Sequence, residues 1–263
     1  DSWSGCGLSL TDADGDGVTD ADDTCADTTD GSIVDSNGCS DSQKDTDGDG
    51  VTDDLDACAD TPEVAMVDEN GCELIFIYLG ENGITIKATE DAVVGENYEL
   101  DGISYQVIDS VMLYQMIFDK KDISKVVTSF VINMSGMFKS DALFNQDIKS
   151  WDVSNVEIMN GMFEGASSFN QNIGNWDVSS VKDMRKMFSN ASSFDQNISS
   201  WNVSNVTQMN NLFKSTPFNQ DIRYWDVSNV EIMNRMFEKA TLFNQDISSW
   251  DVSNVTQMKH MFD

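Results

Sequence analysis

The second half of the chain carries a repeat with a nearly constant period, and this repeat limits the folds that the chain can adopt. Each copy begins with Phe-Asn-Gln or a close variant, continues through a Trp-x-Val segment and ends in Met-Phe or Leu-Phe. The copies start at Phe144, Phe169, Phe194, Phe218 and Phe243. A fixed period in this range is typical of proteins in which each unit buries its apolar face against its neighbours. We therefore expect residues 119–263 to form a stack of repeats.

Within one copy, the apolar residues suggest two short elements. The segment Ile148-x-x-Trp151-x-Val153 has the apolar spacing of a short strand. Ser154 or Asn155 then offers an N-cap oxygen, and the apolar positions between Val156 and Ala166 follow the face of a short helix. The predicted fold is therefore an α/β solenoid of 25-residue leucine-rich-type repeats, with one strand and one helix per repeat.

Residues 73–118 are predicted to form a β-rich cap of this solenoid. The pairs Asn82-Gly83 and Asp101-Gly102 each separate two apolar or alternating runs, which is a strong hairpin signal. Asp109 or Ser110 is expected to cap a short helix over residues 111–118. A ligand-binding β-domain is the alternative, but repeat stacks need their ends covered, which favours a cap.

Residues 1–72 are strongly acidic. They contain 21 Asp and Glu residues against one basic residue, Lys44, and they supply most of the net charge of −31. A segment of this charge repels nucleic acid and anionic membranes, because it lacks the Lys and Arg clusters that neutralise phosphates. It also repels itself unless cations neutralise it. The expected division of the chain is therefore 1–72, 73–118 and 119–263.

The acidic segment contains two copies of one unit with the carboxylate spacing of a calcium loop. Hard Ca²⁺ prefers about six to eight oxygen ligands, and a glycine at the sixth position permits the sharp turn. No amphipathic helices flank the loops, so the sites are expected to stabilise structure without a helix-opening switch. The predicted ligands are Asp12, Asp14, Asp16, Asp20 and Asp23 with the carbonyl of Val18, and Asp45, Asp47, Asp49, Asp53 and Asp56 with the carbonyl of Val51.

All five cysteines lie in the acidic segment, which favours disulfides and an oxidising compartment outside the cytoplasm. Their phase within the repeated acidic unit suggests Cys25–Cys39 and Cys58–Cys72. The alternative pairs Cys6 with Cys25 and Cys39 with Cys58. Sequence spacing does not decide between the two, and either choice leaves one thiol over.

Two family resemblances rest on these motifs. Residues 11–72, with the paired Asp-x-Asp-x-Asp-Gly loops, the Cys-x-Asp-Thr segment and the later Asp-x-x-Gly-Cys, resemble thrombospondin type 3 calcium repeats. Residues 73–263 resemble the BspA-like leucine-rich-repeat surface proteins, including the mycoplasma-type lipoprotein repeat, through Phe-Asn-Gln-Asp-Ile-x-x-Trp-Asp-Val-Ser-Asn-Val. The second resemblance implies a secreted or bacterial cell-surface protein with a role in adhesion and no catalytic role.

No catalytic arrangement stands apart from the repeats, because the single histidine, His260, falls at a position that is polar in the other copies. We therefore expect a non-enzymatic, calcium-binding extracellular protein, without a membrane span or nucleic-acid partner. One hypothesis is an adhesion module that binds a protein or glycan on a cell surface or matrix. The other is a structural subunit that binds copies of itself head to tail in an extracellular filament, because the chain stops at Asp263 in mid-repeat.

Overall fold

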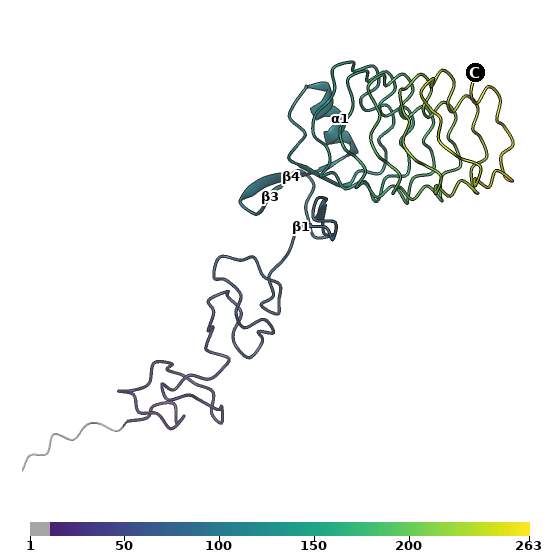
Figure 1. Ribbon diagram of the computed structural model, residues 1–263. Helices are drawn as coiled ribbons and strands as arrows, with labels where there is room; N and C mark the ends of the chain where they lie inside the picture. The colour runs from purple at the N-terminus through teal and green to yellow at the C-terminus, as the bar shows by residue number, and fades with distance from the viewer. Residues whose placement is uncertain (1–10) are drawn as a thin grey trace, which may run out of the picture. The chain divides into compact units, whose positions relative to one another are not determined.

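The computed structural model describes residues 11–263, and the chain divides into two compact units, Asp1–Ile75 and Phe76–Asp263 (Figure 1). We call the described part of the first unit, residues 11–75, the acidic unit. Cys6 lies outside the described residues.

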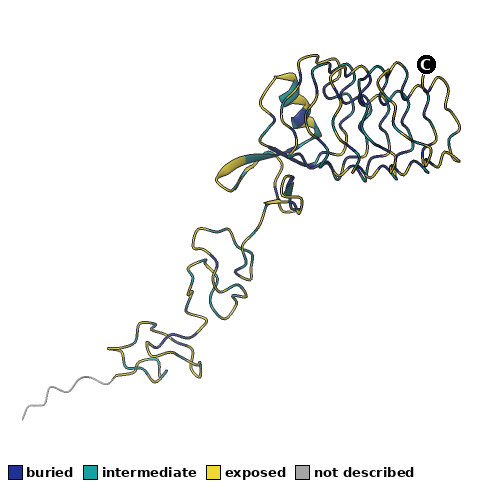
Figure 2. Cartoon of the chain, viewed as in Figure 1, coloured by how far each residue is buried: buried dark blue, intermediate teal, exposed yellow. Residues whose placement is uncertain are grey.

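The acidic unit is made of turns and contains no helix or extended strand over residues 11–75. Two isolated antiparallel bridges, Val34 to Ser40 and Val67 to Glu73, occupy equivalent positions in the two copies of its repeat. Few side chains are buried (Figure 2), and Thr28 and Thr61 are among them. A unit with so little buried apolar surface needs other stabilising interactions.

The second unit begins with two small sheets. Strands β1 (Ile77–Leu79) and β2 (Ile86–Ala88) pair antiparallel around the predicted Asn-Gly turn. Strands β3 (Asn97–Leu100) and β4 (Ile103–Asp109) form the second predicted hairpin, in which Asp101 and Gly102 both have positive φ, as a tight two-residue turn requires. Strand β5 (Val126–Phe130) then pairs parallel with β4.

Helix α1 (Ser110–Phe118) connects β4 to the segment before β5. Its N-cap is Asp109, whose carboxylate accepts a hydrogen bond from the Met112 N–H at 2.8 Å. Leu113 is the fully buried residue of the helix and belongs to the main hydrophobic core. The predicted cap of this helix is therefore confirmed.

After β5, the chain winds through successive coils that lie side by side (Figure 1). We call residues 131–263 the coil stack. One parallel bridge joins each coil to the next, and these bridges follow the repeat spacing. The bridged positions are Asn133, Ile158, Asp183, Gln208, Ile232 and Gln257.

The predicted α/β solenoid is wrong, because the coil stack contains neither the helix nor the strand expected in each repeat. In the segment predicted to be helical, every second backbone N–H leaves its own coil. Met159 N–H donates to Asp183 O, Gly161 N–H to Arg185 O and Phe163 N–H to Met187 O, each at 2.8–2.9 Å. An α-helix would direct these groups to carbonyls of the preceding turn of the same helix.

The intervening N–H groups close short turns instead. Met162 donates to Met159 O, and Ala166 donates to Phe163 O. Gly161 and Gly165 have positive φ, and so do their counterparts Lys186 and Asn190 in the next coil. These left-handed residues interrupt any helix. Where a strand was expected, Trp151 N–H closes a turn on Ile148 O.

Aromatic columns fill the centre of the coil stack. Phe163, Phe188 and Phe213 stack on one another with ring centroids 5.6–5.9 Å apart. The tryptophans form a second column, and their indole N–H groups bond between coils. Trp176 Nε1 donates to Ile148 O at 3.2 Å and Trp201 Nε1 donates to Ile173 O at 3.1 Å. The recurrent tryptophans are therefore buried core residues that also register one coil on the next.

Side-chain amides on the outside of the coils also form hydrogen bonds from one coil to the next. Gln171 Nε2 donates to Asn145 O, and Gln196 Nε2 donates to Asn170 O, each at 2.9 Å. Asn155 was predicted as a possible helix N-cap, but its amide donates to Ser129 O of the preceding coil. These side-chain bonds give hydrogen-bond partners to the backbone groups of the loops. In a sheet, long strands would supply those partners.

Candidate metal centres

The first acidic loop brings three of its predicted ligands together. Carboxylate oxygens of Asp12, Asp14 and Asp16 lie within 4.8 Å of one another. The loop is held by Asp12, whose two oxygens accept from the Gly15 and Gly17 N–H groups at 2.8 and 3.1 Å. Short-range bonds of this kind come from the Asp-Gly sequence itself. These bonds shape the loop that holds the three carboxylates close together.

One oxygen in this group has no partner. Asp16 Oδ2 is buried and accepts no hydrogen bond, whereas Asp16 Oδ1 accepts from the Val18 N–H at 2.8 Å. A buried carboxylate oxygen without a donor is costly, and a bound cation would remove that cost. Oxygen-only donors fit a hard cation such as Ca²⁺.

Asp23 joins this site through the loop around Gly38. A Cβ built on Gly38 would lie 2.1 Å from Asp23 Oδ1 and 3.0 Å from Asp16 Oδ2. Asp23 and Asp16 therefore meet in the space that a missing side chain leaves. Asp23 Oδ1 also accepts from the Cys25 N–H at 2.8 Å.

Asp20 is not brought into the group. Its Oδ1 accepts from the Ala13 N–H at 2.8 Å, and its Oδ2 accepts from the Thr11 hydroxyl at 2.5 Å. Both oxygens therefore close the loop. Val18 is half-buried beside the cluster, and its N–H bonds to Asp16.

The second loop repeats this arrangement. Asp45, Asp47 and Asp49 cluster within 4.8 Å, and Asp49 Oδ2 is again buried without a partner. Asp56 lies against Gly71 as Asp23 lies against Gly38, with a built Cβ 2.2 Å from Asp56 Oδ1. Asp53 closes the loop by accepting from the Thr46 N–H and hydroxyl at 2.8 and 2.7 Å. Val51 corresponds to Val18, and its N–H donates to Asp49 Oδ1.

Two buried threonines support these loops, and the ligand-spacing argument did not identify them. Thr28 N–H donates to Asp14 Oδ2 at 2.8 Å, and the Thr28 hydroxyl lies within hydrogen-bond distance of the carbonyls of Cys25 and Gly38, at 2.9 and 2.8 Å. Thr61 makes the equivalent bond to Asp47 Oδ2 at 2.7 Å. The available signal was their recurrence in both acidic repeats, each time at the end of a Cys-Ala-Asp-Thr segment.

The charge state of a carboxylate in each loop follows from these bonds. The Thr28 N–H lowers the pKa of Asp14 below its ordinary value of 3.8, because a donor stabilises the ionised carboxylate. The hydroxyl and N–H of Thr46 lower the pKa of Asp53 in the same way. These carboxylates are therefore ionised at neutral pH.

Disulfides fix the loops that carry Gly38 and Gly71. The structure contains Cys25–Cys39 and Cys58–Cys72, each with a sequence separation of 14. The alternative in which Cys39 pairs with Cys58 is therefore not the arrangement found. Each bond links the end of an acidic loop to the turn that packs on it, and disulfides of this kind are compatible with an extracellular protein.

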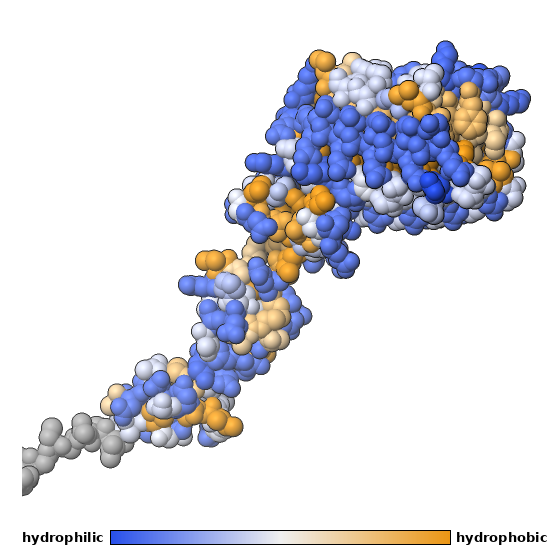
Figure 3. Space-filling model, viewed as in Figure 1, coloured by the Kyte–Doolittle hydropathy of each residue, from blue (hydrophilic) through white to orange (hydrophobic). Residues whose placement is uncertain are grey.

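The coil stack presents a different candidate surface. Figure 3 shows hydrophilic side chains arranged in rows over one face of it. In one row, Ser200 and Ser249 donate their hydroxyls to carbonyls of the preceding coil at 2.8 Å. Tyr224 takes the same position but is 84% exposed, with the Arg223 guanidinium 5.9 Å from its ring centroid. Tyr224 is therefore a large aromatic side chain in a row whose other members are small and polar, and Arg223 lies beside it.

A family model described as "Mycoplasma protein of unknown function, DUF285" matches residues 110–217 and 198–263. This is the family of the BspA-like repeat proteins, and the match includes no leucine-rich-repeat or thrombospondin type 3 signal. No curated protein and no solved structure matches the chain. Within residues 11–263, no helix has the length and apolar character needed to cross a membrane.

Proposed function

The chain belongs to this family of BspA-like repeat proteins of unknown function, and we propose that it is a calcium-stabilised, non-catalytic interaction module that works outside the cell. Its partner would be a protein or a glycan on a cell surface or matrix. The two disulfides of the acidic unit support the extracellular location.

One observation carries the interaction role. The tryptophans that recur in every coil are buried, and the recurrent glutamines bond between coils, so both are used by the fold itself. The positions two residues after the Asp or Asn at 147, 172, 197, 221 and 246 differ from coil to coil. Lys149, Arg223 and Ser248 are exposed there, and Gly174 and Ser199 are half-buried. A rigid surface with variable exposed residues suits recognition of a partner.

Arg223 and Tyr224 are the best candidates for a contact point. Tyr and Arg are enriched among the residues that dominate binding energy at protein interfaces. Tyr224 also occupies a position at which serine hydroxyls bond the preceding coil in other repeats. Its ring takes the place of that hydroxyl and is exposed. The Arg223 guanidinium lies beside the ring and is held by Asp221 at 3.0 Å.

Calcium would serve the acidic unit as a structural ion in this proposal. Ca²⁺ bound at the Asp12–Asp16 and Asp45–Asp49 clusters would neutralise part of the charge of residues 1–72 and engage the buried oxygens of Asp16 and Asp49. No reaction step is assigned to the ion. Its expected effect is to stabilise the fold of the acidic unit.

The test is a screen of the full chain, in calcium, against arrays of glycans and extracellular matrix proteins. Any ligand found is then measured with an Arg223→Ser/Tyr224→Ser variant and with a Lys182→Ser control on another exposed row. We expect the double variant to weaken binding about tenfold or more and the control to leave it unchanged. A screen without saturable binding, or equal binding by both variants, would contradict the proposal.

The same preparation tests the filament alternative, which no specific observation within residues 11–263 favours. Sedimentation velocity of the full chain with calcium and with chelator is expected to show one monomeric species. Concentration-dependent growth into long particles would replace the adhesion proposal by self-assembly.

A further inference from the structure

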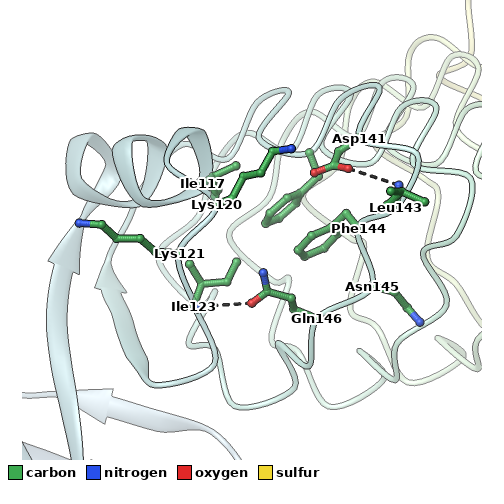
Figure 4. Close-up of a pocket in the computed structure, with 10 residues that line it drawn as sticks. Ile117, Lys120, Lys121, Ile123, Asp141, Leu143, Phe144, Asn145 and Gln146 are labelled. Atoms are coloured by element: carbon green, nitrogen blue, oxygen red, sulfur yellow. Dashed lines mark hydrogen bonds between the residues drawn. The ribbon is translucent and has the colours of Figure 1, made fainter.

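A pocket of about 250 Å³ lies between the end of α1 and the beginning of the coil stack (Figure 4). Its floor is apolar and includes the buried side chains of Phe138, Phe144 and Ile123. Lys120 and Lys121, which follow α1, are on its rim. Neither the metal centres nor the Arg223–Tyr224 pair involves these residues.

The pocket lies where an aromatic column ends. The ring centroids of Phe144 and Phe169 lie 5.8 Å apart. The column continues through Phe194, Phe218 and Phe243, with centroids of successive rings 5.9–6.4 Å apart. One repeat before Phe144, the equivalent position is occupied by Asp119, the C-cap of α1, whose carboxylate accepts from Gln115 Nε2 on the helix. The column therefore has no ring on this side of Phe144.

The exposed fractions of the rings agree with this arrangement. Phe144 is 6% exposed, whereas Phe169 and Phe194, which have a ring on both sides, are 0% exposed. Phe138 lies parallel to Phe144 with ring centroids 3.6 Å apart, so the pocket floor is formed by two stacked rings. A planar ring entering the pocket meets an aromatic surface like the one that each coil offers to the next.

The charged side chains at the rim of the pocket determine which kind of aromatic compound fits there. In Figure 4, Lys120 extends across the pocket toward Asp141, and the ammonium group of Lys121 points away from the rings. No ion pair joins Lys120 to a carboxylate anywhere in the described part of the chain, residues 11–263. Asp141 also lines the pocket, and its Oδ1 accepts from the Leu143 N–H at 3.3 Å.

We propose that this pocket binds a small aromatic carboxylate. The ring would lie beside Phe144 in the place of the missing column member, and the carboxylate would pair with the Lys120 ammonium group. An apolar cavity of about 150 Å³ is enough for benzene, so the larger volume here accommodates one ring and a short acidic chain.

The first test follows the methyl NMR signal of Ile123 in the full chain during titration with 3-phenylpropionate. Two matched compounds separate the parts of the proposal: hexanoate keeps the charge without the ring, and 2-phenylethylamine keeps the ring with a positive charge. We expect a saturable shift with 3-phenylpropionate and binding at least about fivefold weaker for the other two. Absence of saturation, or an amine that binds as tightly as the acid, overturns the proposal.

Lys121 supplies a matched control for Lys120. Lys120→Ala is expected to weaken 3-phenylpropionate binding about threefold or more, and Lys121→Ala to leave it unchanged. Equal loss in both variants would show a general charge effect and would refute the assigned role of Lys120.

The ring platform has a matched control inside the stack. Phe144→Leu and Phe194→Leu remove the same atoms from one column, but only the first change alters the pocket. Both are expected to lower stability, and only Phe144→Leu to abolish binding. If neither variant folds, Ile117→Phe tests the site by filling it with a ring, and unchanged binding in that variant contradicts the location.

Discussion

Gly38→Ala is expected to disable the first metal centre, whereas Gly31→Ala is expected to leave it intact. Both glycines have positive φ, at +80° and +86°. A Cβ at Gly38 would lie 2.1 Å from Asp23 Oδ1 and 3.0 Å from Asp16 Oδ2, while a Cβ at Gly31 would meet nothing within 4 Å. The two substitutions therefore share the backbone strain and differ in the effect on the carboxylates.

The magnitudes follow from that difference. Placing alanine in the left-handed region costs about 1–2 kcal/mol at either position. Gly38→Ala also displaces the Asp23 carboxylate and weakens its bond from the Cys25 N–H, a charged hydrogen bond worth about 1.5–3 kcal/mol. We therefore expect Gly38→Ala to cost about twice as much stability as Gly31→Ala. Loss of one carboxylate from the set should also lower calcium affinity at that loop about tenfold or more.

The assay is calorimetric titration of the calcium-free full chain, combined with thermal unfolding at low and saturating calcium. Calcium at about 100 times its dissociation constant should add about 2.7 kcal/mol to the stability per site, and Gly38→Ala should lose one such contribution. Gly71→Ala should produce the equivalent loss in the second loop, because its Cβ would lie 2.2 Å from Asp56 Oδ1. Unchanged calcium affinity in Gly38→Ala, or loss of a site in Gly31→Ala, would refute this reasoning.

Two further predictions concern the acidic unit and the coil stack. The N–H groups of Asn37 and Asn70 lower the pKa of Asp35 and of Asp68 below the ordinary value of 3.8, so these carboxylates add stability above about pH 4 that is lost as pH falls through the lowered values. Calcium-free denaturation curves of the chain and of Asp68→Asn should therefore differ more at pH 6 than at pH 3, because the chain loses the ionised Asp68 carboxylate as pH falls. An equal difference at the two pH values would count against this effect. Trp201→Phe keeps most of the buried ring and removes the indole N–H that bonds Ile173 O, while Ile173 O keeps its bond from the Trp176 N–H. Chemical denaturation should therefore show a loss of about 0.5–1.5 kcal/mol, whereas a loss within experimental error would mean that the Trp201–Ile173 bond adds nothing.

The turn chemistry of the sequence was sufficient to predict both hairpins and the capped helix. Asn82-Gly83 and Asp101-Gly102 favour tight turns by their backbone preferences alone, without information from distant residues. The constant period of the Phe-Asn-Gln copies likewise predicted stacked repeats. These features are local or periodic, and sequence shows both directly.

The helix predicted in each repeat failed for a physical reason. Apolar residues spaced by three and four fit one face of a helix, but they also fit a chain of short turns whose alternate N–H groups bond the next coil. The deciding feature is the positive φ at Lys186, Asn190 and their counterparts. Glycine occupies both positions in one coil, at Gly161 and Gly165, and one position in the preceding coil, at Gly136, but Lys and Asn give no comparable signal.

The candidate sites differ in the same way. The Asp spacing predicted that the carboxylates at 12, 14 and 16 gather, whereas Asp20, also predicted as a ligand, lies outside that group and accepts hydrogen bonds from Thr11 and Ala13. The aromatic pocket depends on a residue that is missing from a column. Sequence motifs are defined by residues that are present, so Asp119 gives no signal of its own.

The alternating hydrogen bonds of the coil stack also determine how it should fold and unfold. Each coil bonds to the one before it and the one after it, so the free energy of an interior coil depends on two interfaces and that of an end coil on one. Folding can therefore propagate coil by coil at a nearly constant loop-closure cost, because every new contact joins residues about one repeat apart. Amide hydrogen exchange should be slower in a coil with two bonded neighbours than in a coil with one, which makes protection against exchange a measure of position along the stack.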